Sequence, residues 1–340
     1  MSWMLESPGL DRDKRCRPGN EILQFCFYPL RFEFVAKEPL YFPPGKAANI
    51  LRGALGVIFR RTACVAECPG ARICDKRDSC LYARIFEPIA HGDGPSGLAD
   101  WPRPFVFRAR HLDGRTIGPG DAFHFDLNLF LLEQTALSCF VSTFASIVQE
   151  GLGPRRGKAQ LQRVICGGCA IYDSACAIYE SACEATALPQ EPAMLDLTPA
   201  TNAPDRVRVE FLSPTELKHE HRIASRPEFP ILFGRIRERI STLSRLYGAG
   251  NLDIDYTGTN ERAGRVRMTA CEVRRQETRR RSTKTGLVHS IGGFIGFAEY
   301  EGDLAEFLPW LHAARWTGVG RQAVWGKGEI LSTPINRSAG

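Results

Sequence analysis

The 340-residue sequence contains no apolar run approaching the roughly 18 to 20 residues that a membrane-spanning helix requires. Residues 1–8 also lack the charged-then-apolar order that begins a secretory signal peptide. The first absence excludes a helical membrane protein, and the second argues against secretion. We therefore expect a cytoplasmic protein with no membrane partner.

The sequence also lacks the two common nucleotide-binding contexts of a glycine-rich loop. A dinucleotide fingerprint runs strand, glycines, helix, and a P-loop needs Gly-Lys-Ser/Thr opening a helix. Here a predicted helix precedes the glycines and a predicted strand follows them. Glycine lets a backbone approach a ligand and expose its N–H groups, so the order favours a clamp on single-stranded nucleic acid over a glycine-rich turn with incidental charges. The clamp would consist of Gly318, Gly320, Arg321, Gly326, Lys327 and Gly328.

The sequence has no net positive charge outside one segment. Residues 261–284 hold nine cationic and three anionic side chains, an excess of six that equals the formal net charge of +6 of the whole chain. A local basic patch of this kind neutralises phosphates by releasing counterions. The alternative is a solvated hairpin arm. The candidate RNA-binding cations are Arg274, Arg275, Arg279, Arg280, Arg281 and Lys284.

The twelve cysteines, without a secretory signal, argue against a disulfide framework. Cys64, Cys68, Cys74 and Cys80 lie close enough in sequence, within an insertion at residues 62–100, to converge on one ion. A structural zinc ion or an iron–sulfur cluster would both suit four thiolates. Two disulfides or four free thiols are the alternatives.

A heptad repeat occupies the extension at residues 166–186. Its cysteines, Cys169, Cys176 and Cys183, would stack along one helix face about 10 Å apart, which is too far for one ion. We therefore interpret this segment as a duplicated insertion without a metal site.

Hydrophobic periodicity predicts the order βαββαβ twice. In the first half we expect strands at residues 21–42, 105–110, 122–130 and 159–165, with helices at 46–61 and 133–149. In the second half we expect strands at 206–212, 265–273, 287–300 and 324–331, with helices at 231–247 and 304–313. The fold class is therefore α+β, with tandem ferredoxin-like (RRM-like) domains at residues 21–186 and 205–334 joined by a Pro- and Ala-rich linker at 187–204. Each sheet would carry two helices on one face and leave the other free for RNA.

Several phrases, in this order and spacing, resemble the repeat-processing endoribonucleases of CRISPR systems within the RAMP superfamily. The resemblance covers most of residues 21–332. The phrases are LRGALG at residues 51–56, PG at 119–120 with FDLNLF at 125–130, GLG at 151–153, GGFIG at 292–296 with YEGDL at 300–304, and VGR at 319–321 with GKG at 326–328.

The resemblance implies metal-independent cleavage of CRISPR precursor RNA by attack of a ribose 2′-OH on its adjacent phosphate. Many family members place a histidine in or just before the first helix, and residues 41–61 contain none. Lys46 and Arg52 would then position the phosphate and stabilise charge, with Tyr41 nearby and His289 reaching the groove between domains. The missing histidine leaves a second hypothesis open, a non-catalytic RAMP subunit that binds the repeat tag within a complex of other CRISPR subunits.

Overall fold

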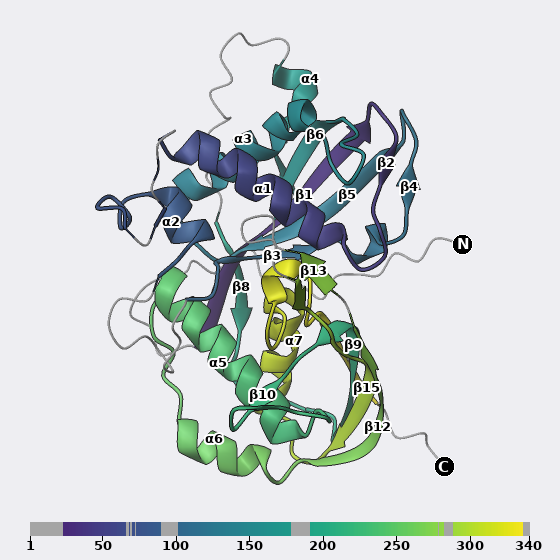
Figure 1. Ribbon diagram of the computed structural model, residues 1–340. Helices are drawn as coiled ribbons and strands as arrows, with labels where there is room; N and C mark the ends of the chain where they lie inside the picture. Colours follow the sequence, from purple (N-terminus) through teal and green to yellow (C-terminus); the bar gives the residue numbers. More distant parts are fainter. Residues whose placement is uncertain are drawn as a thin grey trace.

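Two antiparallel sheets organise the chain into an N-terminal and a C-terminal lobe, the upper and lower halves of Figure 1. The computed structural model describes residues 23–65, 68, 70–71, 73–89, 101–177, 191–277, 279–281 and 288–335. Among the described helices, none combines the length and apolar content needed to cross a bilayer.

The N-terminal sheet has the order β3-β5-β1-β6-β7. Alternate residues of its central strand, such as Phe32 and Phe34, are buried under helices α1 and α3, which pack against each other on one face. The elements of this lobe are β1 (Gln24–Ala36), β2 (Leu40–Tyr41), α1 (Ala47–Ala63), α2 (Leu81–Phe86), β3 (Phe105–Arg108), η2 (Arg110–Leu112), β4 (Thr116–Ile117), β5 (Ala122–Leu129), α3 (Gln134–Glu150), β6 (Ala159–Cys166), β7 (Cys169–Asp173) and α4 (Ser174–Ala177).

The C-terminal sheet has the order β12-β15-β9-β16, with α5 and α7 packed together on its inner face. In both lobes the four core strands follow the ferredoxin-like order, which confirms the predicted fold class. The elements are β9 (Arg206–Thr215), β10 (Lys218–His219), β11 (Arg222–Ile223), α5 (Phe229–Tyr247), α6 (Tyr256–Ala263), β12 (Arg267–Gln276), β13 (Arg279–Arg281), β14 (Val288–Ser290), β15 (Gly293–Glu301), α7 (Leu308–Thr317), η3 (Ala323–Trp325) and β16 (Ile330–Pro334).

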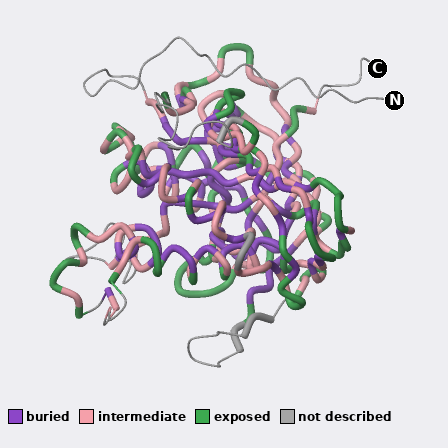
Figure 2. Tube along the Cα trace, turned by 90° about the horizontal axis from the view of Figure 1, so that it is seen from above, coloured by how far each residue is buried: buried purple, intermediate pink, exposed green. Residues whose placement is uncertain are grey.

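Strand β1 joins the two lobes because its first half packs into the core of the C-terminal lobe. Phe25 and Phe27 are fully buried there, together with Val106 of β3 and with Phe130, which directly follows β5. This part of the N-terminal sheet's open face is therefore covered and cannot take RNA, contrary to the expectation of a free face. Figure 2 shows the buried segments running through the middle of the molecule.

The last carbonyl groups of α7 are bound from outside the helix. Asn128 Nδ2 donates to the Trp316 oxygen at 2.8 Å, Arg108 donates to the Arg315 oxygen at 2.8 Å, and Arg239 donates to the Thr317 oxygen at 2.8 Å. Donors and cations at a helix C-terminus satisfy its unpaired carbonyls and oppose the negative end of the helix dipole. Because the glycine-rich loop follows α7 directly, the bonds from Arg108 and Asn128 hold its starting point against the N-terminal lobe.

Three local predictions differ from the structure. Strand β8 (Ala193–Asp196) lies within the predicted linker, where it pairs with the start of β1. The residues after Cys169 form strand β7 along β6 rather than a helix, because an open sheet edge was available. The last strand begins at Ile330, and the residues predicted to start it form η3.

Candidate functional site

The N-terminus of α1 lies at the boundary between the lobes. Lys46 is the exposed N-cap residue of α1, and its side chain makes no cap hydrogen bond. Instead the Ala47 N–H donates to Asp113 Oδ1 at 2.9 Å, so a loop 66 residues away caps the helix. Burial raises the pKa of the Asp113 carboxyl, while the Ala47 N–H and the Lys327 charge oppose that rise.

Lys327 reaches this helix end from the glycine-rich loop. Its side chain is buried, and Nζ donates to the Gly45 oxygen at 3.3 Å. Burial lowers its pKa, and the nearby Asp113 opposes that shift. Lys327 was predicted to contact RNA as part of the loop, but the structure places it as a contact between the lobes.

The four loop glycines all have positive φ, between 67° and 75°. Three of their amides are bound internally, because the N–H of Gly318 donates to the Ala314 oxygen, that of Gly326 to the Ala323 oxygen and that of Gly328 to the Pro214 oxygen. A Cβ on Gly328 would lie 1.9 Å from the Val319 oxygen, and one on Gly320 would lie 2.3 Å from the Glu216 oxygen. Three of the four glycine amides thus bond to the protein's own backbone, and the close contacts at Gly320 and Gly328 leave no room for a side chain. Binding of RNA by this loop stays a prediction.

Arg321 and Arg52, two further cations predicted to meet RNA, also contact other groups of the protein. Arg321 forms an ion pair with the buried Glu216, with 2.7 Å between Nη1 and Oε1. Arg52 was expected to position the phosphate, but only 8% of it is exposed. Its guanidinium carbon lies 4.8 Å from the centre of the Phe86 ring and 5.1 Å from that of Trp325. These contacts hold η3 against α1, so Arg52 is not a ready phosphate ligand.

The basic segment continues from β12 into the β13–β14 hairpin. Arg274 is exposed, whereas Arg275 donates to Glu277. Arg279, Arg280 and Arg281 form β13, and Lys284 lies outside the described residues. His289 lies on β14 opposite Arg280. Its neighbour Ser290 accepts a hydrogen bond from Gln322 Nε2 at 3.2 Å, so the base of the hairpin adjoins the glycine-rich loop.

The structure adds a histidine that the sequence analysis missed. His111 follows β3 in η2, two residues before the Asp113 that caps α1. Its Nε2 lies 2.8 Å from the His124 carbonyl oxygen, and the two imidazole rings stack 4.5 Å apart. A carbonyl can only accept, so Nε2 donates and Nδ1 remains the basic nitrogen of the neutral ring. Nothing in the local sequence indicates that His111 lies near α1, because only the tertiary fold brings the two segments together.

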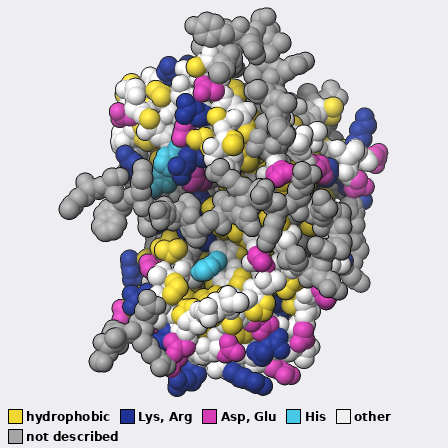
Figure 3. Space-filling view, turned by 180° about the vertical axis from the view of Figure 1, so that it is seen from behind, with side chains coloured by type: hydrophobic (Ala, Val, Ile, Leu, Met, Phe, Trp, Pro, Cys, Tyr) yellow, Lys and Arg dark blue, Asp and Glu magenta, His cyan; other side chains and the backbone are white. Residues whose placement is uncertain are grey.

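His111 and His124 belong to the part of the N-terminal sheet's open face that the C-terminal lobe leaves uncovered. The Arg31–Asp126 ion pair, 2.7 Å between Nε and Oδ1, lies on the same strands. Burial lowers the pKa of His124, and the charge of Arg31 adds to this effect. Figure 3, seen from behind, shows histidine side chains among basic and acidic ones in the upper half of the molecule.

Tyr41 pairs with Thr116 in the short β2–β4 ladder and is half-buried. It lies five residues before Lys46, on the segment that leads into α1. The structure therefore brings Tyr41, Lys46, Lys327, Asp113 and η2 to one region, and puts Arg52 into the packing behind it.

Three of the four predicted metal-ligating thiols interact. The Cys64 thiol neighbours those of Cys68 and Cys80, and burial together with these neighbours raises its pKa to about 11. Cys74 is likewise a free thiol. Within the described ranges, no group of three or more His, Cys, Asp or Glu side chains has an arrangement that could hold a metal ion.

The chain is therefore built from two ferredoxin-like units, with a glycine-rich loop before the last strand. Residues 23–193, half of the chain, match the AF_1859_N family model, which describes an N-terminal domain. Residues 209–330 match the model described as CRISPR-associated endoribonuclease Cas6. The chain thus belongs to the AF_1859_N family, and most of its C-terminal lobe carries the Cas6 match.

Solved structures share this fold at low identity. A Cas6 product complex of Thermus thermophilus (TTHB231) is 15% identical, with 90% of this chain and 100% of that chain covered and a TM-score of 0.50. A chain of a partial Cas6-RT-Cas1–Cas2 complex is 12% identical, with 94% of this chain and 48% of that chain covered and a TM-score of 0.52. No curated protein matches the sequence.

Proposed function

We propose that this protein cleaves CRISPR precursor RNA within the repeat, at the boundary where α1, η2 and the glycine-rich loop meet. The observation that carries the proposal is the exposed Lys46 at the positive end of α1, beside a loop that supplies both Asp113 and His111. The match of residues 209–330 to an endoribonuclease family supports the same activity.

The proposed reaction needs no metal. His111 Nδ1 takes the proton from the ribose 2′-OH, whose oxygen attacks the adjacent phosphorus. The bond from phosphorus to the 5′-oxygen breaks, and that oxygen is protonated, which leaves a 2′,3′-cyclic phosphate and a 5′-hydroxyl. Lys46 stabilises the charge on the phosphorane, as a positioned cation does in other phosphoryl transfers. Tyr41 and His289 stay candidates for the proton delivered to the leaving oxygen.

We propose that the cations from Arg274 to Arg281 bind the repeat hairpin, because their hairpin adjoins the loop at the boundary. Repeat RNA is then the principal partner, and other CRISPR subunits are further candidates. The thiols of Cys64, Cys68, Cys74 and Cys80 have no part in this reaction.

The test is incubation of the purified chain with cognate repeat RNA in EDTA, followed by mass analysis of the product ends. We expect a 2′,3′-cyclic phosphate, and a rate that falls on the order of 100-fold in His111→Ala and in Lys46→Ala. His221→Asn, at an exposed turn position, is the matched control. Intact RNA after long single-turnover incubation would refute cleavage.

The second candidate function, binding of the repeat tag without cleavage, is favoured by two observations. Residues 41–61 contain no histidine, and Arg52 lies between two aromatic rings. Tight binding of uncut RNA by the wild-type chain would support it.

A further inference from the structure

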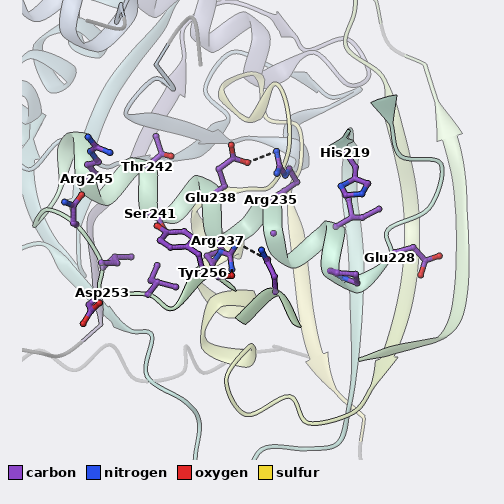
Figure 4. Close-up of a pocket in the computed structure, with 17 residues that line it drawn as sticks. His219, Glu228, Arg235, Arg237, Glu238, Ser241, Thr242, Arg245, Asp253 and Tyr256 are labelled. Atoms are coloured by element: carbon purple, nitrogen blue, oxygen red, sulfur yellow. Dashed lines mark hydrogen bonds and ion pairs between the residues drawn. The ribbon is translucent and has the colours of Figure 1, made fainter. Parts of the chain in front are cut away.

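A groove of about 1210 Å³ runs along the outer face of α5 in the C-terminal lobe. One wall is the segment from Asn251 to Tyr256, which leads into α6. In Figure 4, Arg245 and Asp253 lie at one end, His219 and Glu228 lie at the other, and Arg237 and Tyr256 lie between them. The groove is separate from the boundary region where we place RNA cleavage.

Arg237 is a buried cation without a counter-ion among the described residues. Only 7% of it is exposed, and it donates to two neutral acceptors, the Tyr256 oxygen at 3.1 Å and Asn260 Oδ1 at 2.9 Å. In the described part of the chain, its Nε has no hydrogen-bond partner. The two carboxylates whose charge acts on Arg237 are paired elsewhere, since Arg235 binds Glu238 at 2.7 Å and Arg262 binds Glu306. A buried charge without a partner is costly, so an anion would stabilise this site.

Two further positions on the same face of α5 also indicate a ligand site in the groove. Ser241, one turn after Arg237, has a buried Oγ that lacks a hydrogen-bond partner among the described residues. Gly234, nearly one turn before it, has no described atom within 4 Å of where a Cβ would lie. Glycine weakens a helix interior, and nothing in the described fold requires it here. A ligand that approaches the helix backbone would require it.

The opposite wall is apolar and includes a ring. Tyr256 is 48% exposed, and Leu252 and Ile254 line the groove beside it. The Arg237 guanidinium carbon lies 4.8 Å from the centre of the Tyr256 ring. A flat ring could pack on this wall while an attached anion meets Arg237 and Ser241. Glu228 and Asp253 at the two ends disfavour a long polyanion such as RNA.

We propose that this groove binds a small phosphorylated molecule with an aromatic ring, of the nucleoside monophosphate class. Arg237 and Ser241 hold the phosphate, Gly234 gives it room to approach α5, and Tyr256 packs on the ring. The site is distinct from the RNA-cleaving region.

The test is calorimetric titration of the full chain with AMP, adenosine and inorganic phosphate. We expect one saturable site for AMP, and binding of adenosine or phosphate alone to be weaker by about tenfold or more, because each lacks one half of the recognised group. Equal binding of AMP and adenosine, or no saturable binding of AMP, would overturn the proposal. So would competition by repeat RNA, which would make the groove part of the RNA path.

Two variants separate loss of the site from loss of the fold. Gly234→Leu should fill the open space and weaken AMP binding about tenfold or more, with an unchanged or higher unfolding midpoint and unchanged RNA cleavage. Ser241→Ala should weaken AMP binding roughly threefold to tenfold. Gly53→Leu, at an equally open helix position of α1, is the matched control for AMP binding. If Gly234→Leu binds AMP as tightly as the wild type, the groove is not the AMP site. RNA cleavage is measured separately, so a failure of the AMP proposal and a failure of the cleavage proposal can be told apart.

Discussion

Replacing Gly328 by alanine tests whether the glycine-rich loop serves packing or RNA contact. A Cβ at this position would lie 1.9 Å from the Val319 oxygen, and φ is +67°. The change also strains two backbone hydrogen bonds, from the Val319 N–H to the Gly328 oxygen at 2.9 Å and from the Gly328 N–H to the Pro214 oxygen at 3.0 Å. We therefore expect a loss of stability before any direct effect on RNA binding.

The magnitude follows from these contacts. A left-handed conformation costs a non-glycine residue about 1 to 2 kcal/mol. Each weakened backbone hydrogen bond adds about 1 kcal/mol. The expected loss is therefore about 3 to 4 kcal/mol, which corresponds to a fall in the melting temperature of roughly 4 to 6 °C if the 340-residue chain unfolds as one unit.

The assay is urea and thermal unfolding of Gly328→Ala beside Gly53→Ala. Gly53 lies in α1 with no described atom within 4 Å of a Cβ, so alanine there should stabilise the protein by about 0.5 to 1 kcal/mol. If Gly328→Ala unfolds like the wild type while its affinity for repeat RNA falls, the packing argument is wrong and the loop is an exposed clamp.

Three further predictions concern charge and metal. Burial raises the pKa of Asp113 above its unfolded value of 3.8, so in the window just above pH 3.8 the folded chain binds more protons and the free energy of unfolding falls as pH rises. Asp113→Asn keeps an acceptor for the Ala47 N–H and should remove this fall in urea unfolding across pH 4 to 7. A pH profile identical to that of the wild type would contradict the argument. Arg274→Ala should lower the slope of log affinity for repeat RNA against log salt by roughly 0.7 to 0.9, whereas Arg275→Ala, whose cation already binds Glu277, should lower it less. The triple alanine variant of Arg279, Arg280 and Arg281 should lower the slope further, and an unchanged slope would mean that this hairpin does not meet phosphate. Elemental analysis tests the cysteine site: about one zinc per chain, or iron with visible absorption, would support a four-thiolate centre, and a metal-free chain with four titratable thiols would refute it.

The sequence was sufficient to predict the class of fold. Alternating apolar residues such as Phe32 and Phe34, and helical spacing such as Leu51 and Leu55, report which face each element buries, and this information is local. The repeated βαββαβ order then allowed few arrangements other than two ferredoxin-like sheets. Secondary structure was predicted wrongly where it depends on a distant partner. The segment that forms β8 was predicted as a linker, but it is a strand because it pairs with β1.

The candidate site was only partly predictable, because residue type does not reveal whether a cation meets solvent or the fold. Lys46 and Lys327 look alike in sequence, yet one is exposed and the other is buried against Gly45. Arg52 lies in α1 as predicted, but Phe86 and Trp325 cover it from distant segments. Local sequence thus determined the elements and the local excess of positive charge. Tertiary packing alone decided which charges remain accessible, since burial and pairing depend on residues far apart in the chain.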